Sequence, residues 1–255
     1  MKISCCIDMM FSGLEFADRI AAVSNSGLSA IEFWKWSNKD IDGIADALKQ
    51  SNTKLSVFNI DSTDENLSYD LSRGILNAGR VDDFLRAIKE SIPVYKKLDA
   101  SAMIVIIGEH SQYNKENIKS CLVAALPILR ENDVTIIIEP LNSFDRKGYS
   151  MPYVTPVFEL LRGINDPHIK MLYDIYHQNM MGDFDMQEII ENIDYIGHFH
   201  VADAPGRHEP GTGGVDYVSI IKEINKTRYN GYIGLEYRST KPDRETFGFL
   251  EEANV

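Results

Sequence analysis

Cysteine and histidine are scarce in this sequence, and no long uncharged apolar segment interrupts its 255 residues. The three cysteines (Cys5, Cys6 and Cys121) are too few and too scattered for a disulfide framework, so we expect buried free thiols. No stretch approaches the roughly 18 uncharged apolar residues of a membrane span. Asp8 interrupts the amino-terminal run where a secretory signal would stay apolar, so we expect a cytoplasmic protein with no membrane partner.

Basic residues are in the minority, because 26 Lys and Arg stand against 38 Asp and Glu, a formal net charge of −12. Such a charge repels nucleic acid and anionic membranes at long range, which argues against a nucleic-acid partner. A small-molecule substrate in a local pocket remains compatible with it. With 44% hydrophobic residues and no linker or low-complexity tract, we predict one domain over residues 1–255.

The sequence does contain a regular alternation of short β-branched runs and amphipathic segments. Several runs are apolar at nearly every position, as in strands covered on both faces of a parallel sheet. Helix start signals lie between them: Asp185 with Glu188 three residues on, Thr155 followed by Pro156, and Asp216 before an apolar face. The predicted strands are 2–7, 30–34, 54–60, 102–108, 134–141, 169–175, 195–201 and 231–237.

Eight such strands, one per roughly 32 residues, predict an α/β fold of the (β/α)8 or TIM barrel class. The competing doubly wound open sheet usually carries a glycine-rich phosphate turn after its first strand, and this sequence has none there. Residues 61–80 form a longer connection than an ordinary strand-to-helix loop, which is typical of a lid or an active-site segment.

The active site of such a barrel lies at the carboxyl ends of its strands, so the last polar residue of each late strand is a candidate. Four of these residues are 35, 26 and 36 positions apart along the chain: Glu139, Asp174, His200 and Glu236. Three carboxylates converging in one cavity would repel one another unless a cation lay between them. The set therefore predicts one divalent cation, Mn²⁺ or Mg²⁺ first, with Zn²⁺ or Co²⁺ as alternatives. Separate hydrogen bonds at the rim of the barrel would not explain why four such residues stand at the ends of four consecutive strands.

The motifs around these residues resemble the hydroxypyruvate isomerase family, within the xylose isomerase-like barrels that include the ketose 3-epimerases. The resemblance rests on IEPLN, YDIYHQ, HFHVADAPGRHEPGTG and GLEYR. It spans nearly the whole chain and is strongest from residue 134 to 238. It implies metal ligation by the four residues above, and proton transfer by Glu139 and Glu236.

The resemblance also implies substrate contacts. His177 and Arg207 match positions that contact substrate in these families. Arg73 belongs to a weaker arginine-glycine pattern, and His110 follows the fourth predicted strand at the rim. The implied reaction is a metal-dependent isomerisation through an ene-diolate, between hydroxypyruvate and tartronate semialdehyde or within a related 2-oxo sugar acid. A homo-oligomer, dimer or tetramer, is the implied assembly.

Three departures from the family pattern bear on the substrate. His200 stands where hydroxypyruvate isomerases often carry glutamine and 3-epimerases carry histidine, Gly214 replaces a usual acidic residue, and IEFWKW (31–36) is an uncommon second strand end. A ketose isomerase or 3-epimerase of a neutral sugar is the main alternative, and a non-catalytic sugar-binding barrel is the second. An endonuclease acting on abasic DNA is disfavoured, because it would need several metals, many histidines and a basic face.

The remaining histidines and tryptophans have structural explanations. His198 shares the strand face of His200, and we favour a packed rim position over a role in supporting the site. Trp34 and Trp36 are expected to pack in the core or rim, although either could line the cavity. His168 precedes a strand and is expected to be structural.

Overall fold

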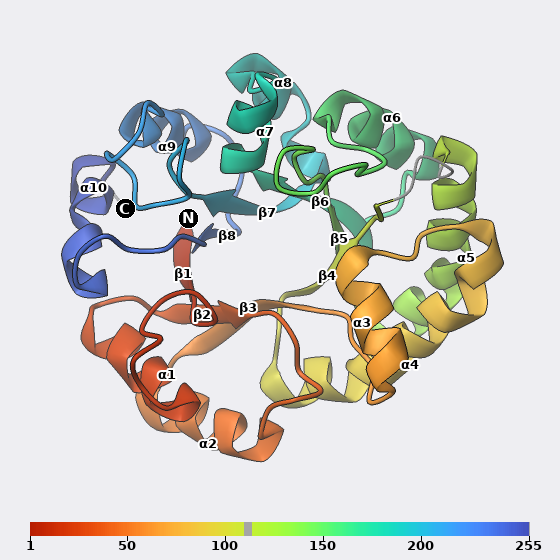
Figure 1. Ribbon diagram of the computed structural model, residues 1–255, viewed down its shortest axis with the longest axis horizontal. Coiled ribbons are helices and arrows are strands. Elements are labelled where there is room, and N and C mark those ends of the chain that lie inside the picture. Colours follow the sequence, from red (N-terminus) through yellow and green to blue (C-terminus); the bar gives the residue numbers. More distant parts are fainter. Residues whose placement is uncertain (110–113, 255) are drawn as a thin grey trace.

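The computed structural model describes residues 1–109 and 114–254, and within them eight parallel strands close into a barrel in chain order (Figure 1). Every strand lies inside its predicted range, so the predicted fold class is confirmed. The strands are β1 (Lys2–Cys6), β2 (Ala30–Phe33), β3 (Lys54–Asn59), β4 (Ala102–Ile106), β5 (Ile136–Glu139), β6 (Ile169–Asp174), β7 (Ile196–Val201) and β8 (Tyr232–Leu235).

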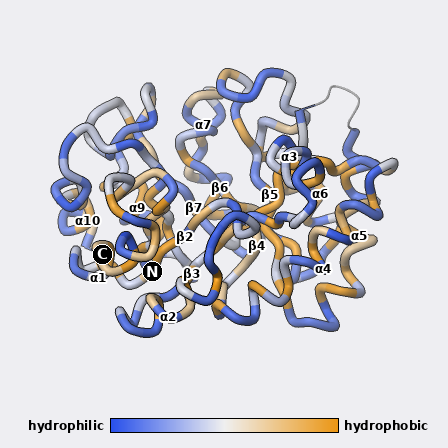
Figure 2. The backbone as a smooth tube through the Cα atoms, turned by 60° about the horizontal axis from the view of Figure 1, so that its bottom comes forward, coloured by the Kyte–Doolittle hydropathy of each residue, from blue (hydrophilic) through white to orange (hydrophobic). Residues whose placement is uncertain are grey.

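Helices surround the barrel and cover the outer face of the strands (Figure 1). They are α1 (Phe16–Asn25), α2 (Ile41–Ser51), α3 (Glu65–Arg73), α4 (Val81–Leu98), α5 (Lys115–Asn132), α6 (Val154–Ile164), α7 (Ile175–Met181), α8 (Met186–Glu191), α9 (Tyr217–Asn225) and α10 (Gly248–Glu252). Figure 2 shows hydrophobic segments gathered in the middle of the molecule and hydrophilic ones in the peripheral turns. Among the helices described, none combines the length and the apolar character needed to cross a membrane.

Two of the three predicted helix starts are confirmed. Asp185 accepts a hydrogen bond from the backbone N–H of Gln187 ahead of α8, and Asp216 accepts one from Ser219 at the start of α9. The third prediction is wrong by two residues, because α6 begins at Val154 and Pro156 takes its third position. A proline is tolerated there because the N–H groups of the first turn have no intrahelical partner.

The register of β6, β7 and β8 places the carboxyl ends of these strands at one level of the barrel. Asp174 pairs with His200 across β6 and β7, and His200 pairs with Gly234 across β7 and β8. A Cβ atom at Gly234 would lie 2.5 Å from Glu32 Oε1 and 2.7 Å from His200 Cδ2. Glycine at this position therefore leaves room inside the barrel for the side chains of Glu32 and His200.

The long connection after β3 folds over the carboxyl ends of the strands. It contains α3, whose first turn is capped by Asp64, and a short 3-10 turn from Ala78 to Arg80. Arg146 from the loop after β5 donates a hydrogen bond to the carbonyl oxygen of Ser72, 3.1 Å away, which ties α3 to that loop. The segment that was predicted as a lid or active-site segment thus forms one wall of the cavity described next.

Candidate active site

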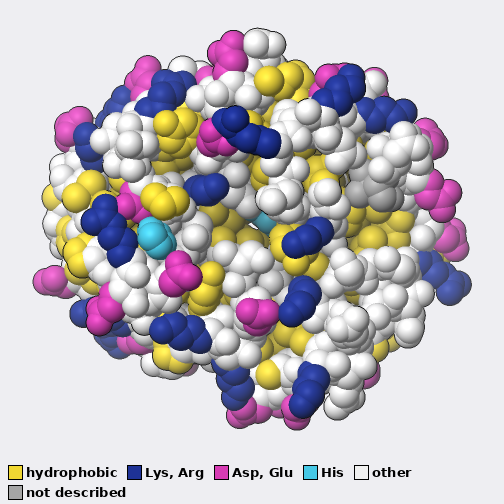
Figure 3. Space-filling model, turned by 180° about the vertical axis from the view of Figure 1, so that it is seen from behind, with side chains coloured by type: hydrophobic (Ala, Val, Ile, Leu, Met, Phe, Trp, Pro, Cys, Tyr) yellow, Lys and Arg dark blue, Asp and Glu magenta, His cyan; other side chains and the backbone are white. Residues whose placement is uncertain are grey.

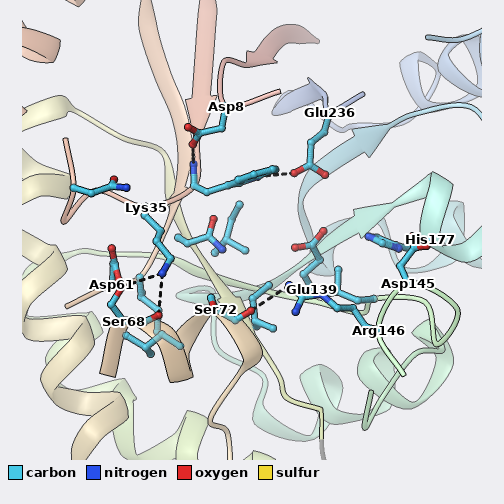
Figure 4. Close-up of a pocket in the computed structure, with 18 of the residues that line it drawn as sticks. Asp8, Lys35, Asp61, Ser68, Ser72, Glu139, Asp145, Arg146, His177 and Glu236 are labelled. Atoms are coloured by element: carbon cyan, nitrogen blue, oxygen red, sulfur yellow. Dashed lines mark hydrogen bonds between the residues drawn. The ribbon is translucent and has the colours of Figure 1, made fainter. Parts of the chain in front are cut away.

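A cavity of about 330 Å³ lies at the carboxyl ends of the strands, within the 300–1,000 Å³ range typical of small-molecule pockets. Figure 4 shows its lining from both sides of the barrel, with Lys35, Asp61 and Ser68 on one side and Glu139, His177 and Glu236 on the other. Because these residues follow strands on opposite sides of the barrel, closure of the sheet brings them around one cavity.

The four predicted metal-binding residues meet at this end of the barrel. Glu139 ends β5, Asp174 ends β6, His200 lies in β7 and Glu236 follows β8. All four are buried, and one potential ligand atom from each lies within 4.8 Å of the others. The Nδ1 atom of His200 is 3.3 Å from Glu236 Oε2 and 3.6 Å from Glu139 Oε1.

The donor set fits a divalent cation. His200 Nδ1 is buried and makes no hydrogen bond to any described residue, although it faces carboxylates. Burial raises the pKa of Glu139, and it raises the pKa of Asp174 to about 7. Both shifts reflect the cost of concentrating negative charge away from water. A cation between the four side chains would use the free nitrogen and relieve that cost, so these residues could hold one.

Glu32, which the sequence analysis missed, supports His200 from inside the barrel. Its Oε1 atom lies 2.9 Å from His200 Nε2, and its Oε2 atom lies 2.9 Å from His198 Nε2. His198 is buried and contacts this carboxylate. The sequence analysis favoured a packed rim position for His198, whereas the structure gives it a role in supporting the site. The sequence did offer a signal for Glu32, because this acidic residue lies inside an otherwise apolar strand.

The Glu32 carboxylate also accepts hydrogen bonds from the hydroxyl groups of Ser4 at 2.7 Å and Ser56 at 3.2 Å. Burial alone would raise the pKa of Glu32, but His200 and His198 lower it to about 2. The carboxylate is therefore ionised, and it holds His200 with Nε2 toward itself and Nδ1 toward the acidic cluster. A carboxylate behind a metal-binding histidine commonly fixes the ring in this way.

Arg207 and Trp34 both contact Glu236. The Arg207 guanidinium forms an ion pair with Glu236 Oε2, and its Nη2 atom lies 3.8 Å from Asp174 Oδ2. The indole Nε1–H of Trp34 donates to Glu236 Oε1 at 2.8 Å, so Trp34 lines the cavity while Trp36 packs in the core. Burial would raise the pKa of Glu236, but Arg207 and His200 hold it well below its ordinary value.

The loop after β7 holds Arg207 through its backbone. Arg207 N–H donates to the carbonyl oxygen of Asp203 at 3.0 Å, and the Arg207 carbonyl accepts from Arg238 N–H at 2.9 Å. The Asp203 carboxylate accepts further hydrogen bonds from the N–H groups of Gly211 and Gly213. The proline- and glycine-rich motif thus wraps around one buried aspartate, which presents Arg207 to the cavity.

His177, at the start of α7, presents a neutral ring to the cavity. Its Nδ1 atom accepts from the backbone N–H of Asn142 at 3.2 Å, so the ring proton sits on Nε2. Burial, assisted by Arg207, lowers the pKa of His177 well below its ordinary value. Nε2 lies 3.4 Å from Asp174 Oδ2 and has no hydrogen-bond partner among the described residues. It is therefore a buried donor beside the cluster.

Arg73 and His110 were also predicted to contact substrate. Arg73 is half exposed, forms an ion pair with Glu109 and is absent from the cavity lining, so its role stays a prediction. His110 lies outside the described residues. The predicted structural role of His168 agrees with its contact to Asp166, where Nδ1 and Oδ1 are 2.9 Å apart. Further lining residues that the sequence analysis did not predict are Asp8, Lys35, Lys39, Asn59, Asp61, Ser68, Ser72, Asp145 and Arg146.

The fold and the site define the class of protein to which this chain belongs. Residues 20–253 match the model of the xylose isomerase-like TIM barrel family, and the chain belongs to that family. Hydroxypyruvate isomerase of Escherichia coli K12 is 27% identical over 244 residues, covering 93% of each chain. The 2-oxo-tetronate isomerase of Pectobacterium atrosepticum is 24% identical and covers 98% of this chain and 97% of its own. These relatives confirm the resemblance and indicate an isomerase, that is, an intramolecular oxidoreductase.

A solved structure titled AP endonuclease, family 2, from Brucella melitensis superposes with a TM-score of 0.89 and 24% identity over 98% of both chains. At that identity it shows the fold alone. On the face drawn in Figure 3, Lys and Arg side chains are interspersed with Asp and Glu side chains. The described residues on that face form no continuous basic patch of the kind that DNA-binding proteins use to neutralise phosphates.

Proposed function

We propose that this chain is a metal-dependent isomerase of small oxo acids, acting on hydroxypyruvate and tartronate semialdehyde or on a related 2-oxo sugar acid. The observation that carries the proposal is the convergence of Glu139, Asp174, His200 and Glu236 on one point. The relatives named hydroxypyruvate isomerase and 2-oxo-tetronate isomerase support this choice of substrate class.

The four converging residues would hold one divalent cation, with Mn²⁺ or Mg²⁺ preferred for an oxygen-rich set. When bound, the cation would supply Lewis-acid stabilisation for negative charge that develops on the substrate oxygens. The His200 ring would offer its Nδ1 atom to the cation, because Glu32 faces Nε2 at 2.9 Å. Side chains of this chain would carry out the proton transfer and orient the substrate.

Two carboxylates serve the proton transfer. In the forward direction a proton leaves C3 of hydroxypyruvate, an ene-diolate forms, and a proton returns to C2 to give tartronate semialdehyde. Glu139 and Glu236 both line the cavity, and they would remove and return this proton.

Arg207 and His177 would orient the substrate. Arg207 presents a planar guanidinium that can grip a carboxylate through two parallel hydrogen bonds. The neutral His177 ring offers its Nε2–H to a substrate oxygen, because Nδ1 is already used by Asn142. Together they would hold a short hydroxy-keto acid with its reacting carbons beside the two glutamates.

The decisive test is exchange of carbon-bound hydrogen in D₂O. We expect hydroxypyruvate to take up deuterium and to equilibrate with tartronate semialdehyde when the protein carries Mn²⁺. Treatment with a chelator should abolish both processes, and added Mn²⁺ should restore them. Undiminished exchange after metal removal would contradict the metal requirement. Exchange into dihydroxyacetone or a hexulose, but into neither oxo acid, would replace the proposal with a ketose isomerase or epimerase.

A further inference from the structure

The cavity continues across the barrel, away from the acidic cluster. The cluster belongs to β5 through β8, whereas Lys35 follows β2 and Asn59 ends β3. We propose that the β2–β3 side is a second subsite that binds the hydroxyl-bearing tail of a substrate with four or more carbons, and that Lys35 determines this specificity. The inference rests on the proposed function and narrows its substrate class.

Lys35 differs from the other cations in the cavity wall. Lys39 pairs with Asp8 at 3.3 Å, Arg146 pairs with Glu109 at 2.5 Å, and Arg207 pairs with Glu236. Among the described residues Lys35 has no carboxylate partner. In the part of the chain that the structure describes, its ammonium group donates only to Ser68, to Oγ at 3.0 Å and to the carbonyl oxygen at 3.3 Å. One donor position of the three therefore remains for a ligand.

Two acceptors that line the same cavity also lack hydrogen-bond partners among the described residues. Asp61 is buried; its Oδ2 atom accepts from the backbone N–H of Ser37 at 3.2 Å, but Oδ1 has no hydrogen bond to a described residue. The Oδ1 atom of Asn59 is likewise buried without a described partner. Both residues line the cavity, and Figure 4 shows Asp61 on the same side as Lys35. Buried acceptors without partners are costly, so their occurrence together points to a ligand that donates hydrogen bonds.

This combination of groups selects a hydroxyl-bearing tail over an anionic one. A hydroxyl group can accept from Lys35 Nζ and donate to Asp61 or Asn59, thereby satisfying both kinds of group. A phosphate would bring negative charge next to the Asp61 carboxylate. The volume of about 330 Å³ corresponds to about ten water molecules at roughly 30 Å³ each, so a three-carbon acid at the acidic cluster would leave room on the β2–β3 side.

The sequence itself sets this wall apart. Lys35 belongs to IEFWKW, residues 31–36, which run from β2 into the loop at its carboxyl end. The same stretch places Trp34 against Glu236, so one segment contacts both the acidic cluster and the proposed subsite.

Binding of acids that cannot isomerise tests the subsite independently of turnover. Glycerate and erythronate, with three and four carbons, would be titrated calorimetrically into the Mn²⁺-replete protein and into Lys35→Met. We expect erythronate to bind the native protein about tenfold more tightly than glycerate. Lys35→Met should remove this advantage and change glycerate affinity by less than about twofold. Lys49→Met, at an exposed position of α2, is the matched control and should change neither affinity.

Further measurements distinguish a failure of the proposed subsite from a failure of the proposed function. Ser68→Ala removes the hydroxyl that holds Lys35, and it should lower the preference for erythronate less than Lys35→Met does. Equal losses for both acids in Lys35→Met, or no preference in the native protein, would overturn the subsite. Tighter binding of 3-phosphoglycerate than of erythronate would overturn the assignment to hydroxyl groups. If the acids bind as expected but neither hydroxypyruvate nor a four-carbon 2-oxo sugar acid is isomerised, the proposed function fails and the subsite stands.

Discussion

Replacement of Glu32 by glutamine should weaken metal binding although Glu32 is not expected to touch the metal. The substitution keeps the size of the side chain and removes the charge that faces His200 Nε2 at 2.9 Å and His198 Nε2 at 2.9 Å. Without that charge the His200 ring loses its preference for one orientation and tautomer. Loss of a supporting group of this kind typically lowers metal affinity 10- to 100-fold, which corresponds to about 1.4–2.8 kcal/mol.

The assay is a calorimetric titration of Mn²⁺ into metal-free protein, so it does not depend on turnover. Glu131→Gln, at an exposed position of α5, is the matched control and should leave the affinity unchanged. Ser4→Ala removes a 2.7 Å hydrogen bond to Glu32 but keeps the charge, so we expect about 1 kcal/mol less stability and less than a threefold change in affinity. Unchanged Mn²⁺ affinity in a folded Glu32→Gln protein would refute the reasoning.

Three further predictions concern the reaction and the core. Glu139→Gln and Glu236→Gln should each nearly abolish turnover in a protein that still folds; near-normal deuterium exchange in the Mn²⁺-replete variants would show that the proton-transfer assignment is wrong. Arg207→Ala should lower kcat/KM for hydroxypyruvate about 30-fold or more, because a buried charge-assisted pair is worth roughly 2–5 kcal/mol. Equal, small losses on hydroxypyruvate and dihydroxyacetone would favour a neutral ketose as substrate. Burial raises the pKa of Cys5 and Cys6, and that of Cys121 to about 11, so all three thiols should react slowly with Ellman's reagent at pH 8 until the protein unfolds; rapid reaction of any thiol in the native protein would contradict their burial.

The sequence by itself determined the barrel and the acidic cluster. Short apolar runs at regular intervals define parallel strands covered on both sides, and the carboxyl ends of such strands all lie at the same end of a closed barrel. Glu139 and Asp174 could therefore be assigned to one site from their positions at strand ends. The start of α6 was less predictable, because a proline fits any of the first helical positions and does not specify which one.

Only the tertiary structure decided what surrounds the cluster. Glu32 contacts His198 across 166 residues of sequence, and Trp34 contacts Glu236 across 202. Such contacts depend on the tilt and register of strands that close the barrel, and no local pattern specifies either one. The same holds for Lys35, whose lack of a carboxylate partner among the described residues becomes visible only when its neighbours in space are known. Local hydrophobic pattern thus specifies which residues end a strand, whereas closure of the sheet decides which side chains meet across it.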